Sequence, residues 1–162
     1  MTLRVVPLTL ADPAQAAAFI ALLDHYARDP MGGGDGLGAE ARAQLVDRLQ
    51  AVPGFHGALA YDGDAETPLG LINCFLGFST FAARPLLNVH DLVVRAERRR
   101  QGVGQALLAW AETRARELGC CKLTLEVLAN NAPAMAAYRR AGYAPYVLDP
   151  AAGQALLLQK VF

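Results

Sequence analysis

The sequence has few cysteines, and their arrangement excludes two kinds of site. Among 162 residues there are three, at Cys74, Cys120 and Cys121. An odd number with two adjacent members does not make a disulfide framework. No Cys-x-x-Cys pair indicates a zinc site. We therefore expect reduced thiols in or near the core and no bound metal.

An excess of charge of either sign and long apolar runs are also lacking. The 15 basic residues equal the 15 acidic ones. General binders of nucleic acid or of membrane surfaces carry a basic excess, so neither partner is expected. No stretch approaches the roughly 18 apolar residues that span a bilayer. The first residues lack the basic-then-apolar layout of a signal peptide, which predicts a cytoplasmic protein.

Hydrophobic residues are plentiful, at 54% of the chain, and the length suits one domain over 1–162. Periodicity and turn signals predict four helices, over 13–29, 39–51, 103–118 and 133–141. Asp12 and Gln15 form a capping box that opens the first helix. Glycines at 32–36 predict a mobile loop. Alternating apolar residues predict about seven strands, over 3–8, 55–61, 69–80, 86–94, 122–128, 143–147 and 155–161.

The order of these elements predicts the sheet. Consecutive strands over 55–94 form an antiparallel meander. Strand 86–94, helix 103–118 and strand 122–128 make a crossover, which requires parallel flanking strands. The fold class is therefore mixed α/β, with a mostly antiparallel sheet flanked by helices.

The turn between strand 86–94 and the following helix is the most informative segment. Arg95, Arg98, Arg99 and Arg100 against Glu97 leave a local charge of +3. Gly102 and Gly104 open the helix, where unpaired N–H groups and the helix dipole attract anions. Glycines let a phosphate approach the backbone closely. The segment predicts a polyphosphate site. Two alternatives are a solvated or nucleic-acid-binding arginine run, and glycines that only ease the turn.

Two common phosphate motifs are absent. No Gly-x-x-x-x-Gly-Lys-Ser/Thr loop occurs, and Leu107 stands where a dinucleotide fingerprint needs its third glycine. Instead, residues 99–104 (Arg-Arg-Gln-Gly-Val-Gly) fit Arg/Gln-x-x-Gly-x-Gly/Ala. Residues 131–143 fit Asn-x-x-Ala-x-x-x-Tyr-x-x-x-Gly-Phe/Tyr. With these two motifs in this order, the chain resembles the GNAT acetyltransferase superfamily over nearly its whole length, more loosely in its first 60 residues.

The resemblance implies the GNAT acyl-CoA N-acyltransferase fold, with acetyl-CoA in a cleft where the central strands splay apart. The strand end should pair with the cofactor arm and polarise its thioester carbonyl. The turn should bind the diphosphate. Tyr138 should lie beside the sulfur and protonate the leaving thiolate, or else be a core aromatic. The implied cofactor-binding residues are Leu92, Val93, Val94, Arg99, Arg100, Gln101, Gly102, Val103, Gly104, Gln105, Asn131, Ala134 and Tyr138.

The catalytic base remains open at this point. His90 and Asp91 are adjacent in a strand and should face opposite sides, so only one faces the amine. Histidine titrates in a suitable range, which favours His90, with Asp91 second and Glu126 third. His90 is otherwise a structural histidine. By resemblance, the amine pocket would contain Tyr26, Met31, Phe75, Phe78 and Phe81. The three phenylalanines could equally be plain core.

The predicted function is an N-acetyltransferase that moves the acetyl group of acetyl-CoA to a primary amine by direct attack in a ternary complex. The amine is expected to belong to a small molecule, and no acidic cluster marks a dedicated polycation site. Alternatives are a non-catalytic acyl-CoA sensor, a protein or peptide N-acetyltransferase, and a nucleic-acid binder that uses the arginines. The resemblance also allows a homodimer.

Overall fold

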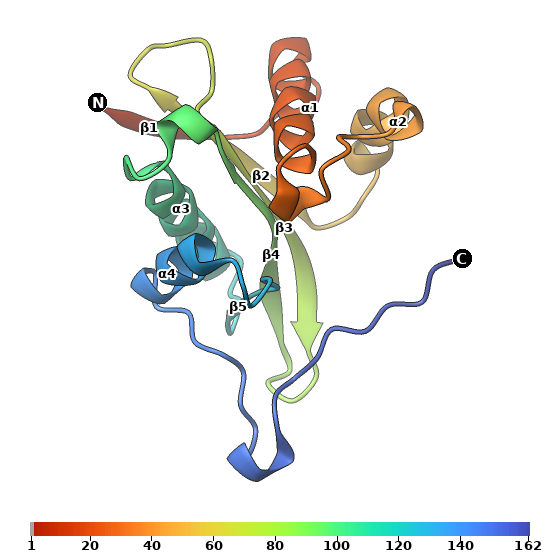
Figure 1. The fold of residues 1–162 in the computed structure, drawn as a ribbon, viewed down its shortest axis with the longest axis vertical. Helices are drawn as coiled ribbons and strands as arrows, with labels where there is room; N and C mark the ends of the chain where they lie inside the picture. Colours follow the sequence, from red (N-terminus) through yellow and green to blue (C-terminus); the bar gives the residue numbers. More distant parts are fainter. Residues whose placement is uncertain (1) are drawn as a thin grey trace. The chain divides into compact units, whose positions relative to one another are not determined.

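The computed structural model describes residues 2–162, which form two compact units (Figure 1). The first unit ends at Leu125, and the second runs from Glu126 to Phe162. The first unit contains a sheet with helices on both faces. None of the helices found in residues 2–162 is both long and apolar enough to cross a bilayer.

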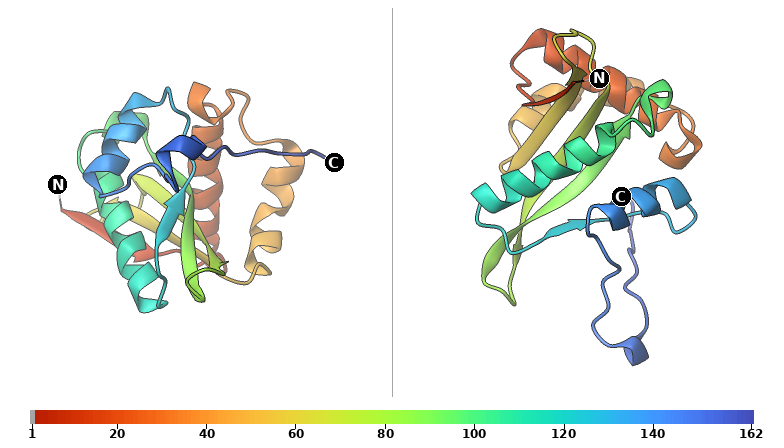
Figure 2. Two further views of the ribbon diagram at one scale, coloured as in Figure 1. Left: turned by 90° about the horizontal axis from the view of Figure 1, so that it is seen from below. Right: turned by 90° about the vertical axis from the view of Figure 1, so that its left-hand side faces the viewer.

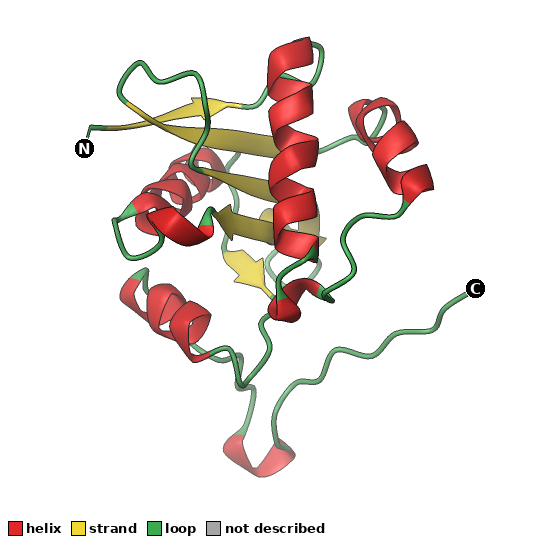
Figure 3. Cartoon of the chain, turned by 45° about the horizontal axis from the view of Figure 1, so that its top comes forward, coloured by secondary structure: helices red, strands yellow, loops and turns green. Residues whose placement is uncertain are grey.

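The strands of the first unit, drawn as yellow arrows in Figure 3, form one sheet. Their order in this sheet is the order in the sequence. The strands are β1 (Leu3–Pro7), β2 (Phe55–Asp62), β3 (Gly70–Ser79), β4 (Arg84–Val94) and β5 (Leu123–Leu125). Neighbours from β1 to β4 pair antiparallel, and β4 pairs parallel with β5. The predicted meander and crossover are confirmed, because a helix of 15 residues lies between the two parallel strands.

Helices cover both faces of this sheet (Figure 2). On one face lie α1 (Pro13–Ala27) and α2 (Ala39–Gln50), and on the other lies α3 (Val103–Glu117). As predicted, the Asp12 side chain caps α1 by accepting from the N–H groups of Ala14 at 2.9 Å and Gln15 at 3.4 Å. Gln15 does not close the predicted capping box, because its Oε1 accepts from the Thr9 N–H at 2.9 Å. The α1 face buries Phe19 and Leu22 against strand side chains that include Leu59 and Leu71. The α3 face buries residues at helical spacing, namely Val103, Leu107, Ala111 and Ala115.

Strand β4 contains one extra residue. Val89 pairs with Cys74 and Asp91 pairs with Asn73, so two neighbours on β3 oppose three residues on β4, and His90 is the β-bulge. Strand β5 pairs with β4 only from Leu87 to Val89, which is the residue before the bulge. Residues 90–94 of β4 therefore extend beyond this pairing, as expected for central strands that separate.

The segment between α1 and α2 is hydrogen-bonded to α1, although its glycines predict a mobile loop. A short 3₁₀ helix, η1 (Pro30–Gly32), follows α1. The N–H groups of Gly34 and Gly36 both donate to the carbonyl of Ala27, at 2.9 and 3.2 Å. A Cβ on Gly32 would lie 2.0 Å from the Tyr26 carbonyl oxygen, so only glycine permits this close return. The glycines here permit a hydrogen-bonded path back along α1.

The second unit contains α4 (Ala132–Arg140) and a 3₁₀ helix, η3 (Pro150–Ala152). Asn131 caps α4 by accepting from the Ala134 N–H at 3.2 Å, as its position predicts. The predicted hairpin of 143–147 and 155–161 is wrong, since the structure assigns no strand to residues 126–162. Apolar alternation is not sufficient for a strand without a hydrogen-bonded neighbour and a buried face, and Leu156, Leu157 and Leu158 are exposed. The described chain thus has five strands instead of seven.

Candidate active site

The turn between β4 and α3 has the geometry of an anion site. Gly102 precedes the helix with φ of 87°, a left-handed conformation that favours glycine. The first intrahelical bond is donated by the Ala106 N–H to the Gly102 carbonyl at 3.0 Å. The N–H groups of Val103 and Gly104 come before it, at the positive end of the helix dipole. The local structure predicted for residues 99–104 is therefore present.

The four arginines of this turn have different surroundings. Arg95 donates through Nε to the Pro68 carbonyl at 2.8 Å. Arg99 donates through Nε to the Val94 carbonyl at 3.3 Å and forms an ion pair with Asp29. Within residues 2–162, no hydrogen bond or ion pair engages the guanidinium of Arg98 or of Arg100. The sequence alone gives these residues one joint role, whereas the structure uses two of them to fix the turn.

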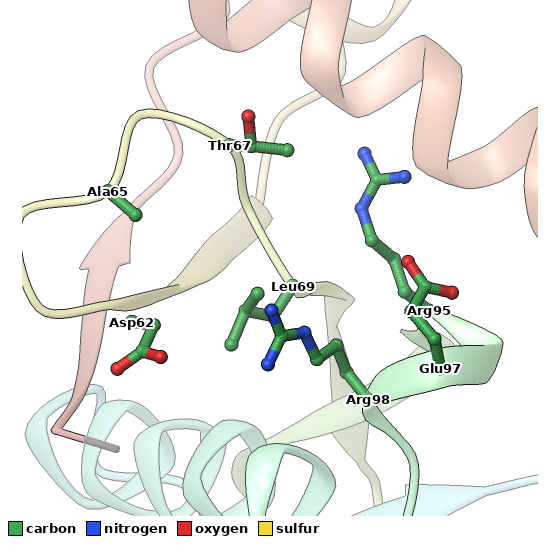
Figure 4. A pocket seen from close by; sticks show the side chains of 7 residues that line it. All are labelled: Asp62, Ala65, Thr67, Leu69, Arg95, Glu97 and Arg98. Atoms are coloured by element: carbon green, nitrogen blue, oxygen red, sulfur yellow. The ribbon is translucent and has the colours of Figure 1, made fainter.

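A cavity of about 260 Å³ lies beside the turn (Figure 4). Figure 4 shows the Arg98 side chain extending over Leu69 in the direction of Asp62. No predicted catalytic or substrate-binding residue lines this cavity, whose walls are Asp62, Ala65, Thr67, Leu69, Arg95, Glu97 and Arg98. Arg98 forms part of this cavity wall. Arg100 is exposed, and no hydrogen bond or ion pair of its guanidinium occurs within residues 2–162.

The bulge places His90 and Asp91 on the same face of the sheet. Asp91 lies opposite Asn73. The His90 ring packs edge-on against Phe75, with ring centroids 5.3 Å apart, and Phe75 packs on the core beneath α1. The expectation that adjacent residues face opposite sides is wrong here, because a bulge residue interrupts the alternation. The imidazole and the carboxylate can therefore act on one substrate group.

Asn73 holds the Asp91 carboxylate and was not predicted as a site residue. Its Nδ2 donates to Asp91 Oδ2 at 3.0 Å, and the residue is 3% exposed. Its Oδ1 is buried without a hydrogen-bond donor in the described structure. The available signal was a single amide within the apolar run Leu71-Ile72-Asn73-Cys74. Buried amides usually have a specific partner.

Tyr26 on α1 lies near this carboxylate. Burial raises the pKa of the Tyr26 phenol, and the negative charges of Asp91 and Asp29 raise it further. The phenol therefore stays protonated at neutral pH, and it donates to the Met31 carbonyl at 3.4 Å. Of the predicted amine-pocket residues, Tyr26 and Met31 contact each other, and the Tyr26 phenol lies within the electrostatic influence of Asp91.

The three predicted phenylalanines do not lie together. Phe75 contacts His90 and also packs on Phe55, with ring centroids 5.6 Å apart. Phe78 is 61% exposed and Phe81 is 105% exposed, at the far end of the β3–β4 hairpin. Phe75 alone adjoins the His90 and Asp91 pair.

Cys74 faces away from this chemistry. It is fully buried, and burial followed by the nearby Asp91 charge raises the pKa of its thiol to about 12. Such a thiol is almost entirely protonated at neutral pH and is a poor nucleophile. All three cysteines are free thiols in the structure.

The second unit carries the remaining predicted site residues. Asn131 and Ala134 are joined by the cap hydrogen bond of α4. Tyr138 is half-buried, and its ring lies 6.0 Å from that of Tyr143. The Tyr143 N–H donates to the Tyr138 carbonyl at 3.0 Å, which closes the helix end.

Comparison with known proteins identifies the family. The model of the acetyltransferase (GNAT) family matches residues 19–143. The chain therefore belongs to the GNAT acetyltransferase family. A solved structure of a probable acetyltransferase is 23% identical, with a TM-score of 0.81 over 98% of this chain and 99% of that one. The two share the mixed sheet and its flanking helices.

Two further relatives have specific names. Streptothricin acetyltransferase of Streptomyces lavendulae is 38% identical over 103 residues, which are 60% of this chain. The match spans 54% of that relative, so the chain aligns with about half its length. An aminoglycoside acetyltransferase from an uncultured soil metagenomic sample, in complex with sisomicin, shares the fold. Its TM-score is 0.74 at 15% identity, over 99% of this chain and 95% of that one.

Proposed function

We propose that the protein transfers the acetyl group of acetyl-CoA to a primary amine of a cationic small molecule. One observation carries this proposal: strand β4 joins the anion turn to the bulge that presents His90 and Asp91. From Asp91 to Val94 the strand advances by about 10 Å. An extended thioester arm along these residues would link a diphosphate in the turn to an amine at the bulge.

The residues of the turn fit a diphosphate. A Cβ on Gly104 would lie 3.7 Å from Val94 Cγ2, an ordinary contact, so packing within the chain does not require glycine there. Because Gly104 has no Cβ, a ligand has room to approach the N–H groups of Val103 and Gly104. Arg100 adds an unpaired charge. In this proposal, acetyl-CoA is bound by Leu92–Val94 and by the segment from Arg99 to Gln105, and it supplies the acetyl thioester.

The amine must lose a proton before it attacks. An alkyl amine has a pKa of about 10.4, so its neutral form costs roughly 4–5 kcal/mol at pH 7. In the described chain Asp91 forms no ion pair with a basic side chain, so a substrate ammonium can be its partner. His90, on the same face and exposed, then accepts the proton. The nitrogen lone pair attacks the carbonyl carbon, and the carbon–sulfur bond breaks to release the thiol.

The second unit carries the residues that match the second family motif. From that match alone, we propose that Tyr138 protonates the departing thiolate and that Asn131 and Ala134 contact the cofactor arm. A thiol near pKa 8.5 leaves readily, so this proton contributes about 10²–10⁴-fold at most.

The relatives support a small-molecule amine as the substrate. The relative at 38% identity is named for streptothricin, and the structural relative holds sisomicin, an aminoglycoside. The Asp91 carboxylate forms no ion pair in the described chain, and in this proposal it would bind an ammonium group of such a substrate.

The test is acetyl-CoA-dependent thiol release with streptothricin, sisomicin, polyamines, amino acids and peptides. We expect release with at least one cationic small molecule, and weaker release at low concentrations of that amine in Asp91→Asn. Titration calorimetry with coenzyme A comes first, and absence of heat at millimolar concentration would overturn the proposal. Binding of coenzyme A without release for any amine would instead favour a sensor, and release with peptides alone would favour a peptide acetyltransferase.

A further inference from the structure

One ion pair connects the predicted amine side of the site with the anion turn. Asp29 lies in the segment that follows α1, and Arg99 lies in the turn before α3, 70 positions later. Asp29 Oδ2 accepts from Arg99 Nη2 at 2.8 Å. The Asp29 side chain is 22% exposed and that of Arg99 is 48% exposed. The pair is thus partly shielded from solvent, although surface pairs of this kind contribute little to stability.

The other carboxylate oxygen of Asp29 organises the segment over Tyr26. Asp29 Oδ1 accepts from the Met31 N–H at 3.0 Å, and the Met31 carbonyl accepts from the Tyr26 hydroxyl. The N–H of Asp29 itself donates to the Tyr26 carbonyl at 2.9 Å. One carboxylate therefore binds Arg99 on one side and the Met31 backbone on the other.

The same segment is anchored at its far end by a second carboxylate. Asp24 accepts from the Leu37 N–H at 2.9 Å, from Arg28 and from Arg42. With Asp24 fixing residue 37 and Asp29 fixing residue 31, the loop of residues 29–37 has two anchors. Only the Asp29 anchor reaches the anion turn.

Arg99 retains donors for a second partner. A guanidinium has five N–H donors, and two of its nitrogens serve the Val94 carbonyl and Asp29. The remaining N–H groups can bind a phosphate oxygen while both contacts persist. Hydrogen bonds from the Met31 N–H and from Arg99 lower the pKa of Asp29, so this carboxylate is ionised at neutral pH.

We propose that Asp29 is a positioning residue that couples the two halves of the site, so that a diphosphate bound at Arg99 tightens the loop of residues 29–37. A ligand bound to the Arg99 guanidinium restricts the motion of Arg99. Through the ion pair, it also restricts the motion of Asp29 and of the loop of residues 29–37. Coupling is reciprocal, so an amine that binds under this loop binds more tightly when the turn is occupied. This inference rests on the proposed function.

The experiment measures amide hydrogen exchange in residues 29–37 with and without coenzyme A, which needs no knowledge of the amine. We expect coenzyme A to slow exchange of the wild-type loop by about fivefold or more. Asp29→Asn keeps an acceptor for the Met31 N–H but turns an amide towards Arg99. It should still bind coenzyme A through Arg100 and the helix N–H groups, and the slowing should disappear.

The matched control is Asp35→Asn, which removes an exposed carboxylate from the same loop and should keep the slowing. Asp29→Glu keeps the charge and should restore part of it. Once the amine is known, Asp29→Asn should raise its KM severalfold while kcat stays within about twofold.

The outcomes separate the two proposals. If wild-type protein binds coenzyme A without slowed exchange in the loop, or if Asp29→Asn keeps the slowing, the coupling role is overturned and the proposed function stands. If Asp29→Asn does not fold, the wild-type comparison and Asp29→Glu still decide. If wild-type protein does not bind coenzyme A, the proposed function fails and this inference fails with it.

Discussion

Asn73 donates a 3.0 Å hydrogen bond from Nδ2 to Asp91 Oδ2, at the register position of β3 and β4 that directly follows the bulge residue His90 on β4. An ionised carboxylate only accepts, so the amide must turn its nitrogen towards Asp91 and its oxygen away. That oxygen is buried without a donor, which costs about 1–3 kcal/mol. The fold thus tolerates a buried Asn73 oxygen without a hydrogen-bond donor, while the amide nitrogen orients the Asp91 carboxylate.

The first prediction concerns this orientation. Asn73→Leu has a similar volume and removes both the donor and the orphaned acceptor. We expect its Tm to stay close to that of the wild type, because loss of the buried acceptor offsets loss of the hydrogen bond. The amine KM should rise severalfold because Asp91 is no longer held. Thermal denaturation and thiol release measure the two effects, and an unchanged kcat/KM would show that Asn73 does not position Asp91.

The second prediction separates the roles of Asp91 and His90. A hydrogen bond to a charged group contributes about 1.5–3 kcal/mol, so Asp91→Asn should raise the amine KM by about 10–150-fold. His90→Gln should lower kcat by about 10²–10⁴-fold with little change in amine KM. Steady-state kinetics at saturating acetyl-CoA distinguishes the two. The opposite pattern would make Asp91 the base and His90 the binding residue.

The third prediction compares two glycines of one turn. Gly102 has positive φ, so Gly102→Ala should destabilise the fold by about 1–2 kcal/mol. Gly104 has no such conformation, and alanine is a better helix former, so Gly104→Ala should keep or raise Tm. Its methyl group, however, occupies the space proposed for the diphosphate. We expect at least tenfold weaker coenzyme A binding, about 1.4 kcal/mol by calorimetry, and unchanged affinity would place the ligand elsewhere.

The fourth prediction uses the pH dependence of stability. Hydrogen bonds from Leu37, Arg28 and Arg42 hold the pKa of Asp24 well below its usual value. A depressed carboxyl pKa stabilises the fold above the unfolded-state value near 4, and this contribution is lost as pH falls through the folded-state value. Asp24→Asn should therefore lower Tm most at pH 7, and the difference should shrink as the pH falls below about 4.

The control for this series is Asp47→Asn, which removes an exposed carboxylate from α2 and should match the wild type at every pH. A Tm difference for Asp24→Asn that stays constant from pH 7 to acid would contradict an electrostatic origin.

The fifth prediction concerns the second unit. Tyr138→Phe removes the proposed proton donor and keeps the ring. We expect slower turnover, by no more than about 10²–10⁴-fold, and nearly unchanged acetyl-CoA binding. Tyr143→Phe, a neighbouring ring in the same unit, is the control and should keep normal turnover. If Tyr138→Phe turns over at the wild-type rate, Tyr138 has no role in the chemistry.

Local sequence signals predicted most of the fold. The Asp12 cap, the Asn131 cap and the parallel crossover all follow from residues close together in the chain. The hairpin of the second unit failed because a strand requires a partner that alternation does not supply. The fixed path of the 29–37 loop depends on carboxylates in α1 and on Arg99, which no local pattern connects.

The site was only partly predictable for the same reason. The start of α3 at Gly102 depends only on residues close together in the sequence, and the structure confirms that a helix begins there. The common face of His90 and Asp91 was missed because a bulge appears only when two strands are paired. Asn73 was missed because its function depends on its register opposite Asp91, although its place in an apolar run was visible.

The bulge also bears on how readily this site could change. Val89 and Asp91 keep their partners at Cys74 and Asn73, which are adjacent on β3, so the ladder is continuous on both sides of His90. Residue 90 is thus an insertion that the backbone pairing does not need. Evolution could exchange or delete this side chain without disturbing the hydrophobic layers, which would let relatives of one architecture acquire different substrates.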